Sequence, residues 1–176
     1  IEELIDLAVV FSCPFLPNGN EVGLLIEAGG GAVASSDACA KTGLNVSPLP
    51  RDAQQKLHEF LKDRIPPSAS LANPVDLVWV PSKEAPLIYA TCLEIMADAV
   101  DSCLMICYAR INDDWFLKRL QGIRDQTKKP IIFVPGNPID QRDGMARATK
   151  LGIPAFAMPN NAVKALAALT RRAKYL

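Results

Sequence analysis

Residues 21–43, which read EVGLLIEAGGGAVASSDACAKTG, decide the fold. The mostly apolar run over residues 21–26 is typical of a strand buried on both faces of a parallel sheet. Three glycines follow at residues 29–31, and residues 32–42 are rich in small residues that suit a helix. Gly43 supplies the left-handed position that commonly ends a helix. The stretch therefore predicts a strand, a glycine-rich turn and a helix in direct succession.

The rest of the chain repeats this alternation of strands and helices. Helical spacing or capping residues indicate six more helices: near residues 4–11, over 51–62, over 83–99, from Asp113 or Asp114 to Lys128 and Lys129, over 140–151, and after Asn160 or Asn161. In the fourth of these, Trp115, Phe116, Leu120 and Ile123 are expected to point inward. Four further strands are predicted at residues 44–49, 102–109, 130–135 and 154–157. An irregular loop rich in proline and serine is expected around residues 66–74.

Strands that alternate with helices require a parallel sheet covered on both faces, with right-handed crossovers. We predict an α/β fold: a flavodoxin-like three-layer sandwich with a five-stranded parallel sheet in the order 2-1-3-4-5. The length of 176 residues fits one domain, 1–176. Ligands of such sheets gather beyond the carboxyl ends of the strands, where strands 1 and 3 diverge. The residues expected there are 27–31, Arg110, Asn112, Gly136 and Asn137.

Composition narrows the possible partners. Nineteen basic residues balance nineteen acidic ones, so the chain has no electrostatic footprint for nucleic acid or for an anionic membrane surface. No apolar run is long enough to span a bilayer. Five single cysteines with no metal-ligand spacing indicate buried, reduced thiols and a cytoplasmic protein, without a metal site. Because the first residue is Ile1 and not Met, we expect the chain to be a piece of a longer protein.

The glycine-rich turn is the best candidate for a binding site. Glycines let backbone approach a ligand closely, and the helix behind them offers unpaired N–H groups and the positive end of its dipole to an anion such as phosphate. The carboxylate of Glu27 opposes an anion. The alternative is a tight turn that binds nothing. The predicted phosphate-binding residues are Ala28, Gly29, Gly30, Gly31 and Ala32, with Glu27 and Arg110 beside them.

Two other features carry weaker signals. Residues 73–76, Asn-Pro-Val-Asp, combine a rigid extended step with two short polar side chains, and on physical grounds a structured loop is the first interpretation. His58 is the only histidine and lies in the middle of a predicted helix, so an exposed surface role is its default. No residue is assigned a catalytic role.

Several stretches together resemble the NDP-forming acyl-CoA synthetases, the superfamily that includes succinyl-CoA synthetase. The matching pieces are residues 1–8 (IEELIDLA), residues 17–44 (PNGNEVGLLIEAGGGAVASSDACAKTGL), the loop at residues 70–77 (SLANPVDL) and residues 151–169 (LGIPAFAMPNNAVKALAAL). They extend over almost the whole chain. By this resemblance the chain is similar to the flavodoxin-like ligase-associated domain of these enzymes.

The resemblance implies a larger enzyme that interconverts an acyl-CoA, a nucleoside diphosphate and phosphate with the free acid, CoA and a nucleoside triphosphate. It implies a phosphorylated histidine, CoA, ATP or ADP, and Mg²⁺, none of them bound by this domain alone. The implied partners are the CoA-binding, phosphohistidine and ATP-grasp domains or subunits. This domain would contribute a helix N-terminus that faces the phosphohistidine. By position, Asp37 matches the family's helix aspartate, and Asn73 and Asp76 match its loop.

The chain also departs from the family pattern. Glu27 stands where the family commonly has Asn, and Gly31-Ala32 stands where it has Pro-Gly. His58 does not match the phosphorylated histidine. Two hypotheses follow: an acid–thiol ligase domain that is inactive alone, or a degenerate structural or regulatory domain. A flavodoxin or receiver domain is a third, weaker alternative, since Arg110 and Pro159 lie at the strand ends where a receiver needs Asp and Lys.

Overall fold

The computed structural model describes residues 1–27, 29–107, 113–136 and 142–176. Its central feature is a parallel sheet of four strands in the order β2-β1-β3-β4. The strands are β1 (Val22–Ile26), β2 (Val75–Asp76), β3 (Ser102–Cys107) and β4 (Ile131–Pro135). In the register, Ile26 lies beside Asp76 on one side and beside Ile106 on the other.

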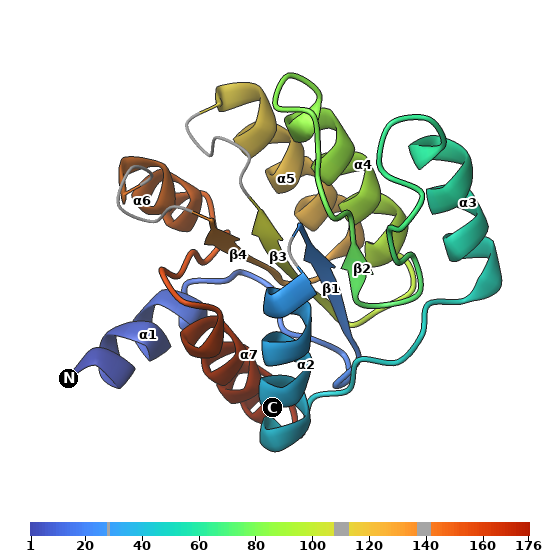
Figure 1. Ribbon diagram of the computed structural model, residues 1–176. Helices are drawn as coiled ribbons and strands as arrows, with labels where there is room; N and C mark the ends of the chain where they lie inside the picture. Colours follow the sequence, from blue (N-terminus) through green and yellow to red (C-terminus); the bar gives the residue numbers. More distant parts are fainter. Residues whose placement is uncertain (28, 108–112, 137–141) are drawn as a thin grey trace.

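Seven helices are assigned within these residues, and they cover the two faces of the sheet (Figure 1). One apolar core joins the sheet to α3 (Arg51–Leu61), α4 (Ala85–Ala97), α5 (Asp114–Thr127) and α6 (Arg142–Lys150). The other joins it to α1 (Glu2–Phe11), α2 (Gly29–Thr42) and α7 (Pro159–Ala173). Every residue of β1 and β4 is buried, as expected for strands covered on both faces. The predicted α/β fold with a parallel sheet is confirmed.

The sheet has four strands and not the predicted five. Residues 44–49 were expected to form the second strand, but only Asn45 makes an isolated bridge, to Glu21. The neighbour of β1 is instead β2, within the segment that was expected to be a loop. At the other edge, residues 154–157 provide only a bridge from Ala155 to Phe133. The bridges made by Asn45 and Ala155 are both parallel, as predicted for strands at these places. Neither extends into a longer ladder, because nearby prolines lack the N–H groups that such a ladder needs.

Two details of the helices also differ from expectation. The Trp115 side chain is 50% exposed, and so does not point inward with Phe116. Neither Asn160 nor Asn161 caps α7; its N-cap is Met158, and the Asn161 amide donates to Asp6 instead. Asp113 does cap α5, because its carboxylate accepts from the backbone N–H groups of Trp115 and Phe116. Within the described residues, no helix is long and apolar enough to cross a membrane.

Candidate functional site

The glycine-rich turn lies at the carboxyl edge of the sheet, between β1 and α2. Gly29 is the first residue of α2, so the N–H groups of its first turn have no partners within the helix. No acidic side chain occupies that first turn. A Cβ added at Gly30 would meet no atom within 4 Å, so the start of the helix is open to a ligand. Helix N-termini with this character attract anions.

Asp76 places a carboxylate beside this turn. Because Ile26 and Asp76 are partners in the parallel register, their side chains lie on the same face of the sheet, the face that α2 covers. Asp76 Oδ2 would lie 3.2 Å from a Cβ at Gly29. Its Oδ1 accepts a 2.9 Å hydrogen bond from the N–H of Val78. The structure therefore places the Asp76 carboxylate beside the start of α2.

Glu27 projects to the other face of the sheet. Its Oε1 accepts a 3.2 Å hydrogen bond from the N–H of Val80, and its Oε2 accepts from the hydroxyl of Tyr89 in α4. Val80 is buried, and Tyr89 is fully buried. These contacts hold the Glu27 carboxylate against α4 and tie the segment after β2 to the end of β1.

Asn73 has a structural place in the sheet. Its side chain is buried and lies beside β1, where its Oδ1 accepts from the N–H of Leu24 at 2.9 Å. Its Nδ2 donates to the carbonyl oxygens of Val22 and Ser47, each at 2.9 Å. The side chain therefore provides hydrogen-bond partners for backbone groups of β1, in the gap that separates the Asn45 bridge from β2. It does not point at the glycine-rich turn.

The remaining predicted site residues are not brought to the turn by described contacts. Asp37 lies further along α2, is exposed, and pairs with Lys41 at 3.3 Å. Ala32 is buried in the core that α2 shares with β1. Ala28, Arg110, Asn112 and Asn137 lie outside the described residues.

Sequence reasoning missed the segment that follows β2. Val78 has φ 61°, a conformation that is rare for a β-branched residue, and the N–H of Trp79 bonds across it to the carbonyl of Leu77 at 2.6 Å. Trp79 is consequently held out at the carboxyl edge with 58% of its surface exposed. The apolar triplet at residues 78–80 gave no turn signal, because it contains neither glycine nor asparagine.

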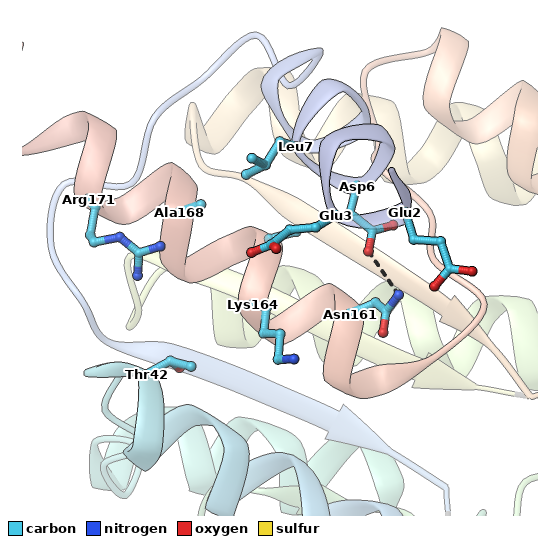
Figure 2. Close-up of a pocket in the computed structure, with 10 residues that line it drawn as sticks. Glu2, Glu3, Asp6, Leu7, Thr42, Asn161, Lys164, Ala168 and Arg171 are labelled. Carbon is cyan, nitrogen blue, oxygen red and sulfur yellow. Dashed lines mark hydrogen bonds between the residues drawn. The ribbon is translucent and has the colours of Figure 1, made fainter.

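A pocket of about 310 Å³ lies elsewhere, between α1, α7 and the end of α2 (Figure 2). Acidic side chains from α1, including Glu3 and Asp6, face Lys164 and Arg171 of α7 across it. Thr42 lines it, and Thr42 is separated from Gly29 by the whole of α2, about 20 Å at the usual helical rise. This pocket is therefore distinct from the glycine-rich turn. No group of three or more metal-ligating side chains occurs among the described residues.

Comparisons with known proteins agree with the sequence resemblance. The model of the Ligase-CoA domain matches residues 22–112. The chain is 27% identical to the Acetate--CoA ligase [ADP-forming] II subunit alpha of Pyrococcus furiosus, over 99% of this chain and 38% of that subunit. It is 32% identical to the Acetate--CoA ligase [ADP-forming] II of Archaeoglobus fulgidus, over 98% of this chain and 26% of that protein.

Solved structures show the same fold. A crystal structure of a Pyrococcus horikoshii OT3 protein superimposes with a TM-score of 0.82 and 25% identity, over 99% of this chain and 40% of that one. The dinucleotide forming acetyl-coenzyme A synthetase 1 of Ca. Korarchaeum cryptofilum, in complex with phosphate and ADP, gives a TM-score of 0.80 over 38% of its length. At 23% identity that likeness supports the fold alone. The chain therefore belongs to the Ligase-CoA domain family, and it is a domain of the kind found in NDP-forming acyl-CoA synthetases.

Proposed function

We propose that this chain works as one domain of a larger NDP-forming acyl-CoA synthetase, where the N-terminus of α2 faces the phosphoryl group of a phosphohistidine. The observation that carries this proposal is the open, acid-free first turn of α2 at the carboxyl edge of a Ligase-CoA domain. The chain spans only 38% of the Pyrococcus furiosus subunit. The complete reaction therefore draws on other domains.

In this role the chain supplies hydrogen-bond donors and no covalent chemistry. The backbone N–H groups at the start of α2 point along the helix axis and stabilise phosphoryl oxygens without reorganisation. Gly30 leaves room for the phosphoryl group to approach the backbone. CoA, ATP or ADP, and Mg²⁺ are assigned to the other domains of the synthetase. The chain alone is expected to form no thioester from acid, CoA and ATP.

A second candidate function is a structural or regulatory domain that no longer handles phosphate. The observation in its favour is Glu27, which stands where the family commonly has Asn and whose two carboxylate oxygens accept from Val80 and Tyr89. A carboxylate at this place adds negative charge near an anion site.

Phosphate titration of the 176-residue chain, followed by amide chemical shifts, tests the proposal. We expect the amides of residues 29–33 to move on addition of phosphate. Gly30→Asp adds a carboxylate to the first turn without a steric clash, so it should abolish these shifts while leaving the thermal melt intact.

Two charge-removing variants refine the same titration. Both Asp76→Asn and Glu27→Asn should tighten phosphate binding, because each removes a negative charge. Asp76→Asn should act more strongly, because Asp76 lies beside Gly29 while Glu27 is held against α4. Asn at position 76 keeps an oxygen that accepts from Val78. Unmoved amides at residues 29–33, or unchanged affinity in both variants, would favour the structural-domain alternative.

A further inference from the structure

The pocket between α1 and α7 is lined by side chains of opposite charge (Figure 2). Asp6 comes three residues after Glu3 and four after Glu2, so the helical repeat gathers the three carboxylates on one face of α1. Lys164 and Arg171 are seven residues apart, almost two turns, and therefore share a face of α7. The pocket thus has an acidic side that α1 supplies and a basic side that α7 supplies.

These charges do not neutralise one another. Among the described residues, none of the five charged side chains that line the pocket makes an ion pair within 4 Å, although exposed pairs such as Lys41 with Asp37 form elsewhere. The carboxylate of Asp6 accepts a 2.8 Å hydrogen bond from the amide of Asn161, which orients it but supplies no positive charge. Three carboxylates and two cations leave the lining with one net negative charge.

The rest of the lining is largely apolar, and the pocket is small. Leu7 and Ala168 are partly buried, and Ala165 is buried. The volume of about 310 Å³ is at the lower end of the range found for ligand pockets. Such a pocket fits a small molecule with a short aliphatic chain and charged groups of both signs.

We propose that this pocket binds a free diamino carboxylic acid, represented by L-lysine. The carboxylate of the ligand is bound by Lys164 and Arg171, its two ammonium groups by the carboxylates of α1, and its aliphatic chain lies along Leu7 and Ala168. At neutral pH this ligand carries two ammonium groups and one carboxylate, so its net charge balances that of the lining. The bound ligand bridges α1 and α7. The inference goes beyond the proposed function and does not depend on phosphate binding.

Titration of the 176-residue chain with L-lysine, followed by amide chemical shifts at constant ionic strength, tests the proposal. We expect the amides of residues 2–7 and 161–171 to move and to saturate, and those of residues 29–33 to stay in place. Unmoved amides along α1 and α7 overturn the proposal. Equal movements in sodium chloride of the same ionic strength also overturn it, because they identify a general salt effect.

A series of related ligands tests the chemical class. Norleucine lacks the side-chain ammonium of lysine, 6-aminohexanoate lacks the α-ammonium, and 1,5-diaminopentane lacks the carboxylate. Each should bind about threefold or more weakly than lysine, because each loses one charged contact in a partly solvated pocket. Norleucine that binds as tightly as lysine overturns the diamino assignment. Diaminopentane that binds as tightly shows that α7 recognises no carboxylate, and it overturns the proposal too.

Variants of the lining test the assigned contacts. Glu3→Gln and Arg171→Gln should each weaken lysine binding by about threefold or more. Arg171→Gln should also reduce the preference for lysine over diaminopentane, because the ligand carboxylate loses a partner. Lys174→Gln is the matched control, since it removes an exposed cation after the same helix and outside the pocket. Glu3 and Arg171 are exposed, so the fold should survive, which thermal melts verify. Undiminished affinity in both lining variants overturns the proposal.

The lysine pocket and the glycine-rich turn can be tested separately in one chain. Gly30→Asp, which should abolish the phosphate shifts, should leave lysine affinity unchanged, because Gly30 does not line the pocket. Lysine binding in a chain that does not respond to phosphate supports this inference and contradicts the phosphate site alone. Loss of lysine binding in a folded Gly30→Asp variant overturns the inference of an independent pocket.

Discussion

The side chain of Asn73 takes the place of a strand neighbour beside β1. Its three hydrogen bonds satisfy the N–H of Leu24 and the carbonyls of Val22 and Ser47 in a buried setting. Buried backbone groups that lose their partners are costly, so the residue at this position determines how β1 is completed on its β2 side. Asn73 also has a φ of 131°, in the range that side-chain-bearing residues rarely adopt.

Asn73→Ala should lower the free energy of unfolding by about 3 kcal/mol, because two buried groups of β1 lose their partners. Urea denaturation of the 176-residue chain measures this change. The matched control is Asn45→Ala, which removes an exposed hydrogen bond to Glu21 and should change stability by about 0.5 kcal/mol or less. Equal effects of the two substitutions would contradict the structural role of Asn73.

At the scale of elements, the turn that follows α6 requires a glycine. Gly152 follows α6 with φ 74°, and an added Cβ would collide with the Arg124 side chain and lie 2.9 Å from Pro14 Cδ. Arg124 is itself buried, pairs with Asp125 at 2.5 Å, and donates to the carbonyl of Leu151. The turn after α6 therefore packs directly against α5.

Gly152→Ala should destabilise the chain by about 2 kcal/mol or more, because it combines an unfavourable φ with a steric clash. Gly122→Ala is the matched control within α5, where a Cβ meets no atom within 4 Å, and it should stabilise the chain by about 0.5–1 kcal/mol. Thermal melts of both variants measure the two changes. A neutral Gly152→Ala variant would show that the packing of this turn is incorrectly described.

At the scale of the whole molecule, five buried cysteines, none of them in a disulfide bond, are distributed over the two cores. This confirms the expectation that the cysteines are buried and not joined in disulfide bonds. Burial raises the pKa of Cys39 to about 11 and the pKa values of Cys92 and Cys103 to about 12. It also raises the pKa of Cys13, although a backbone hydrogen bond and Arg124 act in the opposite direction.

These raised pKa values predict a loss of stability in alkali. Below the ordinary thiol pKa of 9.0 the cysteines are protonated in both states, so folding is unaffected. As the pH rises from 9 towards 11–12, the unfolded chain releases thiol protons that the folded chain retains, and the free energy of unfolding falls. Urea midpoints measured from pH 8 to 11 should show this decline.

The contribution of one thiol can be isolated with Cys39→Ala. This variant should be less stable than the natural chain at pH 8, because it leaves a cavity. It should nevertheless lose less stability between pH 9 and 11. Thiol labelling that is slow in native buffer and complete in denaturant verifies burial. An identical pH slope in the two chains would show that Cys39 does not contribute.

The sequence by itself determined the strands β1, β3 and β4, most of the helices and the family. Each of these strands is a continuous apolar run, and the helices carry local signals such as the Asp113 cap. Burial on both faces of a strand requires such a run, so the pattern is readable without knowledge of the neighbours. The glycine-rich turn is visible for the same reason, because the conformational freedom of glycine is a local property.

Only the tertiary structure decided which segment pairs with β1 and where the site carboxylates point. A two-residue strand has no periodicity to read, and β2 forms because β1 offers it an unpaired edge while Asn73 fills the gap before it. Glu27 follows the apolar run of β1, and Asp76 is the last residue of β2. The parallel register directs the Asp76 side chain towards α2, whereas the Glu27 side chain lies against Tyr89. Partners separated by about fifty residues or more come together only when the whole sheet assembles, so no local pattern of the sequence encodes their contact.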